Sequence, residues 1–335
     1  MARKAALRAV LAGLPALALM TAVSAQAPDL SSERAALNAY QVDDQRLQDI
    51  GWKLVRGNAE FCADTIPAIG LQLLDLASFG RPALARDALE MNGNFAVQTA
   101  AEGSPAALAG LFAPYREVTA IGDADPNQWP AKERSDWERL TRAHDWVDTR
   151  LAEDGGITIT FASGDQASLE PVPACAARFE LLGRGDDAVA DGSRVVIGRD
   201  FPGFDYDEPR LAGAVAHELA HNLLAHRRWL ERNGRSRRNV RRTEREADRL
   251  MPWLLVNAGY EPEDAVRFME SWGPRHSGGI FRKRTHDGWD ERVEFISAEI
   301  PLIRAVIERE GRADWSVHFV REIDPRAGLE DASEG

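Results

Sequence analysis

The chain has 335 residues, of which 44% are hydrophobic and 28% are charged, and its formal net charge is −12. This length and composition are those of a globular protein with one large domain or two domains of ordinary size. The acidic balance argues against nucleic-acid binding, because recognition of phosphates requires a basic surface.

The first 25 residues have the pattern of an export signal. Residues 1–8 contain three basic and no acidic residues, and the apolar run over residues 11–23 is shorter than the roughly 20 residues of a membrane span. Val23-Ser24-Ala25 places small residues at a signal-peptidase cleavage site. We therefore predict a signal peptide over residues 1–25 and a periplasmic or secreted protein without a transmembrane span in its mature form. The alternative is an uncleaved N-terminal membrane anchor.

The two cysteines, Cys62 and Cys175, are predicted to form a disulfide bond, because an even pair in an exported protein is typical of one. The alternative is two buried free thiols. Neither cysteine is close in sequence to a histidine or to the other cysteine, so a role in metal binding is not expected.

Residues 31–77 are predicted to be helical. Ser32 provides a capped start, and the apolar residues Leu47, Ile50 and Leu54 follow at three- and four-residue spacing. We assign residues 26–83 to the N-terminal helical part of the main domain.

Residues 84–175 have a different pattern, with short strands and helices. Strands are predicted at 95–97 and 117–121, a hairpin at 157–172, and helices at 106–111 and 131–152. This order, together with Gly103-Ser104-Pro105-Ala106 and Ala109-Gly110-Leu111, resembles a PDZ domain of the type attached to bacterial proteases. The resemblance implies that a peptide can add as a strand to its sheet edge; the alternative is an unrelated small α+β insert. The two cysteines would join the base of this insert to the main domain.

The remaining residues are divided into a core over 176–312 and a C-terminal tail over 313–335. The core is predicted to be mostly helical. It has a strand at 194–198 and helices at 208–229, 242–258, 262–272 and 290–309.

His217-Glu218-Leu219-Ala220-His221 is an HExxH motif inside one of these predicted helices. Residues four apart lie on one face of a helix, so both imidazoles can reach one tetrahedral metal ion while Glu218 lies beside them. The alternative is a chance occurrence of the motif on a solvated helix, so the third ligand decides between the two interpretations.

A third histidine ligand is not expected. Leu224 and Arg227 occupy the positions where an HExxHxxGxxH site would need glycine and histidine. His226 is one residue out of register, and we expect it to be a packed or partly exposed histidine.

The third ligand is instead predicted to be Glu244. Glu244 and Asp248 are four residues apart in a predicted helix, so Glu244 can bind the metal while Asp248 accepts a hydrogen bond from a ligand histidine. Glu246, between them, is expected to point to another face and to be solvated.

Together with Thr285-His286 and Glu291-Arg292, these motifs resemble the HtpX-like gluzincin family of zinc metallopeptidases, which includes the CAAX prenyl proteases and the Oma-type proteases. The resemblance covers most of residues 31–80 and 176–310. It implies an α+β zincin core, mostly helical with a small sheet, into which the PDZ-like domain is inserted. The chain lacks the membrane spans of the prenyl proteases, so it resembles a soluble, exported branch of the family. It also has Asp287 where the family has a proline after Thr-His.

The resemblance further implies a zinc endopeptidase with one zinc ion bound by His217, His221 and Glu244. Glu218 would be the general base that activates water. His286 and Arg292 are candidates to stabilise the oxyanion, and His286 could instead bind the zinc in a latent resting state. The alternative for both is a structural histidine and a salt-bridged arginine. Gly278-Gly279 would allow this segment to move as a lid.

Residues 227–245 contain nine arginines and two glutamates in an otherwise acidic chain. We predict a solvated, mobile connection beside the active-site cleft. The alternative is a surface that docks acidic peptide segments or anionic lipid headgroups.

The predicted function is internal cleavage of polypeptides in the cell envelope, including misfolded ones. One alternative is a chaperone-like or adaptor protein that binds peptides through the PDZ-like domain and has a latent zinc site. The retained Glu218 argues against this alternative, since a scaffold needs the three ligands but not the base. Zinc-dependent hydrolysis of a small or glycan substrate is a third possibility without a supporting motif.

Overall fold

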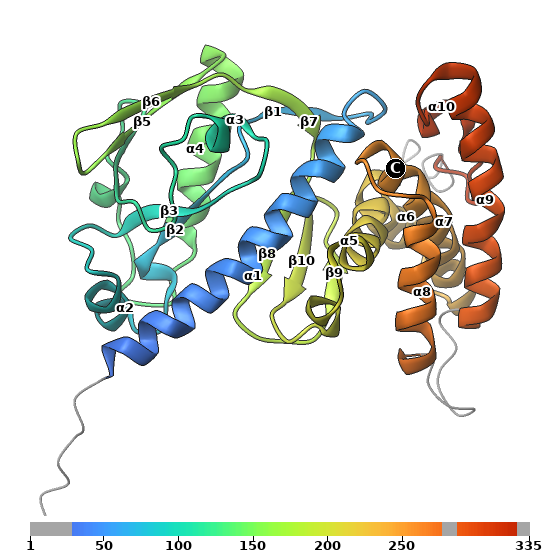
Figure 1. Ribbon diagram of the computed structural model, residues 1–335, viewed down its shortest axis with the longest axis horizontal. Helices are drawn as coiled ribbons and strands as arrows, with labels where there is room; N and C mark the ends of the chain where they lie inside the picture. The colour runs from blue at the N-terminus through green and yellow to red at the C-terminus, as the bar shows by residue number, and fades with distance from the viewer. Residues whose placement is uncertain (1–28, 277–286, 327–335) are drawn as a thin grey trace, which may run out of the picture.

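The computed structural model describes residues 29–276 and 287–326. The chain has an α+β fold in which a long N-terminal helix, α1 (Leu30–Gly57), runs between two parts (Figure 1). One part is a lobe of short strands and helices, and the other is a helical bundle with a small sheet. The predicted signal peptide, residues 1–25, lies outside the described residues.

The start of α1 has a local cause, and its last residue packs against a distant helix. The side chain of Asp29 caps the helix by accepting hydrogen bonds from the backbone N–H groups of Ser31 and Ser32. At the other end, a Cβ atom on Gly57 would lie 2.1 Å from the carbonyl oxygen of Asn257, so the close approach of the two helices requires glycine.

The prediction of helix over residues 58–77 is wrong. Two strands, β1 (Thr65–Ala68) and β2 (Leu71–Asp75), follow α1 instead. Pro67 is unfavourable inside a helix, and so is Gly70, whose φ is +65°. The apolar residues whose spacing suggested a helix are buried here as residues of strands.

The first lobe contains seven of the strands in the described residues, in three antiparallel groups. β1 pairs with β7 (Val172–Cys175), β2 pairs with β3 (Phe95–Ala100), and β4 (Val118–Ile121), β5 (Ile157–Phe161) and β6 (Gln166–Leu169) form a sheet. The helices of this lobe are α2 (Pro82–Leu89), α3 (Pro105–Leu108) and α4 (Glu138–Asp154), with 3₁₀ turns at Leu76–Ser78 and Pro126–Gln128. The predicted strands and short helix in this region are confirmed, but α4 begins seven residues later than residue 131.

This lobe has its own hydrophobic core. Phe95, Ile159 and Phe161 are fully buried in it. Leu71 and Leu73 of β2 also pack in this core, although they precede the predicted boundary at residue 84. The strand therefore joins the lobe through sheet pairing that the sequence pattern did not indicate.

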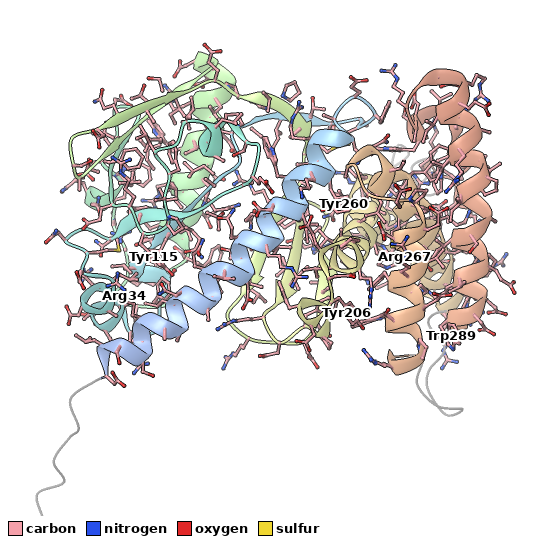
Figure 2. All side chains as sticks on the ribbon, in the orientation of Figure 1. Arg34, Tyr115, Tyr206, Tyr260, Arg267 and Trp289 are labelled. Atoms are coloured by element: carbon pink, nitrogen blue, oxygen red, sulfur yellow. A yellow bond between two sulfur atoms is a disulfide. The ribbon has the colours of Figure 1, made fainter. Side chains whose placement is uncertain are left out.

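Side chains also connect α1 to this lobe. Arg34 of α1 donates to the carbonyl oxygen of Ala88 at 3.1 Å, and Tyr115 of the lobe donates to that of Leu37 at 2.8 Å; Figure 2 labels both side chains near the start of α1. The predicted disulfide bond between Cys62 and Cys175 is confirmed, with a Cα–Cα distance of 5.5 Å. It lies where β1 and β7 pair, at the junction between the lobe and the rest of the chain.

A three-stranded sheet connects the lobe to the helical bundle. β10 (Arg194–Gly198) lies in the middle, with β8 (Arg178–Leu182) parallel to it on one side and β9 (Ala188–Ala190) antiparallel on the other. The predicted strand at 194–198 is confirmed.

The bundle follows the 3₁₀ turn at Pro202–Asp205. Its helices are α5 (Glu208–Leu223), α6 (His226–Asn233), α7 (Arg237–Asn257), α8 (Glu263–His276), α9 (Trp289–Glu310) and α10 (Trp315–His318). Leu211, Leu219 and Trp253 are fully buried in the main core, which α1, the three-stranded sheet and these helices share. None of the helices in the described ranges is long and apolar enough to cross a membrane.

Several boundaries in the bundle differ from the prediction. The helix expected over 208–229 is divided at Ala225, whose φ of 54° is left-handed, and α8 continues through Pro274 rather than stopping there. The Arg-rich residues 227–245 are mostly helical, in α6 and the first part of α7, and are not an irregular connection. The expected tail also packs on the bundle, since Ala313 and Ile323 are buried.

Candidate metal centre

The HExxH motif lies on α5, which is buried in the centre of the bundle. Asp207 caps the helix by accepting a hydrogen bond from the backbone N–H of Arg210. Small residues allow the neighbouring helices to come close: a Cβ on Gly213 would lie 2.7 Å from Cβ of Phe268 on α8. This packing holds the histidines of α5 against α7, which carries Glu244.

The three predicted metal ligands come together. The Nε2 atoms of His217 and His221 are 3.3 Å apart, and the carboxylate oxygens of Glu244 lie 3.4 Å from Nε2 of His217 and 3.6 Å from Nε2 of His221. Two ligand atoms at about 2.0–2.1 Å from one tetrahedral zinc ion lie about 3.3–3.4 Å apart. These three side chains could therefore hold a metal ion without rearrangement of the helices.

Asp248, the predicted partner of a ligand histidine, lies behind His217. Its Oδ1 lies 3.1 Å from Nδ1 of His217, the nitrogen that faces away from Glu244. Arg292 on α9 donates to both oxygens of Asp248, from Nε at 2.6 Å and Nη2 at 2.7 Å. The guanidinium is thus held in a buried ion pair, which agrees with the salt-bridged alternative for Arg292 rather than with a role at the oxyanion.

His221 has a support of its own that the sequence did not reveal. Its Nδ1 lies 2.9 Å from Nδ1 of His226, and Nε2 of His226 lies 3.0 Å from Oε2 of Glu246. Both His226 and Glu246 are almost completely buried, so the prediction that Glu246 is solvated is wrong. The face of α7 opposite Glu244 is covered by α6 and by the C-terminal residues, which periodicity in α7 alone cannot show. The signal available in the sequence was the E-x-E-x-D spacing of three acidic residues in one helix.

Glu218 lies between the metal ligands and β9. Burial raises the pKa of Glu218 to about 7, and the negative charge of Glu244 also raises it. The charge of His217 and the backbone N–H of Ala190 lower the pKa, but by less. A carboxyl group with a pKa near neutrality can both accept and return a proton at physiological pH.

The two ligand histidines differ strongly in their electrostatic surroundings. Burial by itself lowers the pKa of His217, but the carboxylates of Asp248 and Glu244, as hydrogen-bond acceptors and as negative charges, outweigh it and raise the pKa to about 10. Burial lowers the pKa of His221 to about 3. The pKa of Asp248 is below its ordinary value, because Arg292 and His217 together outweigh the effect of burial.

His286 and Gly278-Gly279 lie outside the described residues. Asp287, the next residue after His286, forms ion pairs with Arg245 at 2.8 Å and with Arg241 at 3.2 Å. Two arginines of the Arg-rich segment therefore hold the chain just before α9 begins.

Comparisons with models of protein families, with curated proteins and with solved structures find no match to this chain.

Proposed function

We propose that the chain is a zinc-dependent endopeptidase of the HtpX-like gluzincin type, exported to the periplasm or secreted, with a zincin core and a PDZ-like insert. The observation that carries the proposal is the arrangement of His217, His221 and Glu244 around one position, with the half-buried carboxyl group of Glu218 beside them. The disulfide bond is consistent with an oxidising compartment.

The donor set favours zinc over harder cations. Two imidazole nitrogens and one carboxylate are the ligands of catalytic zinc sites, which leave the fourth tetrahedral position open. Calcium and magnesium instead prefer six or more oxygen ligands. In addition, each histidine is held by a buried polar group on its second nitrogen, as is usual for metal-bound imidazole.

The residues of the chain can perform the proton transfers of peptide hydrolysis. A bound metal supplies Lewis-acid activation of the peptide carbonyl and of a water molecule. Glu218 takes the proton of the attacking water and delivers it to the leaving amine, for which a pKa of about 7 is suitable.

The edge of β9 supports a polypeptide substrate. Among the described residues, β9 pairs only with β10. The backbone N–H of Asp191 donates to the carbonyl oxygen of Arg194, and the backbone N–H of Gly198 donates to that of Asp187. In this register the backbone polar groups of Asp187, Val189 and Asp191 face β10. The N–H and C=O groups of Ala188 and Ala190 therefore point the other way, toward Glu218 and the outer edge. An extended peptide can add to this edge as a strand beside the proposed base.

The adaptor alternative has one observation in its favour. A groove lies where the first lobe meets α1 and β8, and it is lined in part by Trp52 of α1, Leu71 of β2, His144 of α4 and Phe179 of β8. Such a groove offers the adaptor a binding site for a peptide side chain. Cleavage of envelope or misfolded proteins as the biological role rests on the family resemblance alone.

The test compares the purified wild-type protein with Glu218→Gln for zinc content and for cleavage of casein. The proposal requires about one zinc per chain in both proteins and cleavage by the wild type only. If both proteins bind zinc and neither cleaves, the adaptor or a latent enzyme becomes the better explanation. If the wild type binds no zinc, the assignment of the three ligands is wrong.

A further inference from the structure

Glu246 is held by the C-terminal end of the described chain. Arg321 donates from Nε to Oε2 of Glu246 at 2.8 Å. The backbone N–H groups of Glu322 and Ile323 donate to the other oxygen, Oε1, the latter at 2.8 Å. With N–H donors directed at both of its oxygens, Glu246 acts as a carboxylate, which can only accept hydrogen bonds.

A carboxylate at this position determines where the protons of two histidines lie. Nε2 of His226 faces Glu246 and must carry the proton, which in a neutral imidazole leaves Nδ1 of His226 as an acceptor. Nδ1 of His221 faces that acceptor and must in turn carry its own proton. The free lone pair of His221 is then on Nε2, the nitrogen that faces His217 and Glu244. The opposite arrangement would place a bare nitrogen against the carboxylate and a proton at the metal position.

We propose that residues Phe319–Pro325, which we call the C-terminal strap, are part of the metal centre. Through Glu246 and His226, the strap fixes His221 in the tautomer that presents Nε2 to the metal. This inference rests on the metal site of the proposed function but not on peptidase activity.

The Arg-rich segment gives the strap its position. Arg232 donates to the carbonyl oxygen of Pro325 at 3.2 Å, and Arg245 forms an ion pair with Glu322 at 3.2 Å. Arg242 donates to the carbonyl oxygen of Glu322. Three arginines that had no assigned role in the sequence therefore hold the strap against α6 and α7.

Apolar packing anchors the strap as well. Ile323 is 2% exposed and packs with Trp229 and Leu230 of α6, and the indole N–H of Trp229 donates to the carbonyl oxygen of Asp324 at 2.9 Å. Two buried side chains, Phe319 and Ile323, thus anchor the strap and fix its register, as a positioning role requires.

The support of His217 provides an internal comparison. It consists of Asp248 on α7 and Arg292 on α9, and none of its contacts involves the strap. Loss of a strap contact should therefore affect His221 alone, and the site should bind metal more weakly while keeping its other two ligands.

The first experiment measures the affinity for Zn²⁺ in competition with a chromophoric chelator. Arg321→Met removes the strap's charge from Glu246, and Arg326→Met is the matched control, because Arg326 is an exposed residue just beyond the strap. We expect Arg321→Met to raise the Kd roughly 10–100-fold, as substitutions behind metal ligands do, and Arg326→Met to leave it within about twofold. An unchanged Kd in a folded Arg321→Met protein would overturn the inference. Absence of zinc binding by the wild type would instead refute the proposed metal site.

The second experiment does not depend on metal binding or on the stability of Arg321→Met. Long-range ¹H–¹⁵N NMR of the metal-free wild type reports which ring nitrogen of His221 carries the proton, and the expected nitrogen is Nδ1. In Glu246→Gln, the side-chain amide can donate to His226 and reverse both histidines, so the proton of His221 is expected on Nε2. A His221 protonated on Nε2 in the wild type, or unchanged by Glu246→Gln, would contradict the proposal.

Discussion

Binding of zinc is predicted to release about one proton per site at pH 7. In the metal-free protein, Asp248 and Glu244 raise the pKa of His217 to about 10, so its imidazole carries two protons at neutral pH. Nε2 of His217 faces the metal position and must lose its proton before it can bind a metal. His221, with a pKa of about 3, is already neutral and contributes no proton.

The strength of the competition between the proton and zinc for His217 follows from the difference between the pKa of His217 and the working pH. A pKa of about 10 is three units above pH 7, and each unit corresponds to about 1.4 kcal/mol. Proton competition therefore weakens zinc binding at pH 7 by about 4 kcal/mol relative to the fully deprotonated site. The apparent Kd is expected to rise about tenfold for each unit that the pH falls between about 9 and 7.

Calorimetric titration of Zn²⁺ in buffers with different ionisation enthalpies counts the released protons directly. The measurement is best made on Glu218→Gln, because Glu218 has a pKa of about 7 and could release part of a proton of its own near a cation. If no proton is released and the Kd does not change with pH in this variant, His217 is neutral before binding. The electrostatic account of His217 would then be wrong.

Two further predictions concern the stability of the fold. Cys62→Ala/Cys175→Ala should lower the free energy of unfolding by about 4–5 kcal/mol in denaturant titrations, because the bond closes a loop with a sequence separation of 113 residues; a change below about 1 kcal/mol would contradict the loop-entropy argument. Burial raises the pKa of Asp44 to about 6 despite hydrogen bonds from Gln48 and Gln98. The folded state then binds this proton more tightly than the unfolded chain does. Relative to Asp44→Asn, the free energy of unfolding of the wild type should therefore fall by about 1–3 kcal/mol as the pH rises from about 4 to about 6. A difference in unfolding free energy that stays constant over this pH range would refute the prediction.

The parts of the site that are close in sequence could be recognised from the sequence alone. His217 and His221 are one helical turn apart, as are Glu244 and Asp248, and this spacing determines that each pair shares a face of its helix. The disulfide could likewise be predicted, because the export-signal pattern favours one and two cysteines have a single possible pairing.

The first strands of the lobe were harder to predict. β1 and β2 were expected to be helical, since over a short stretch their apolar spacing is compatible with both the helical period and the strand period. They became strands because partners far along the chain, β7 and β3, were available to pair with them. Strand pairing depends on contacts between distant segments, and a single short pattern contains no information about the partner.

The support of His221 was decided only by the tertiary structure. His226 and Glu246 are 20 residues apart, and Arg321 is 75 residues beyond Glu246. Periodicity assigned Glu246 to the solvated face of α7, and it is indeed on the face opposite the metal. That face is buried because the C-terminal strap folds back over it. Helical spacing determines the direction in which a side chain points, but only the packing of distant segments determines what it meets there.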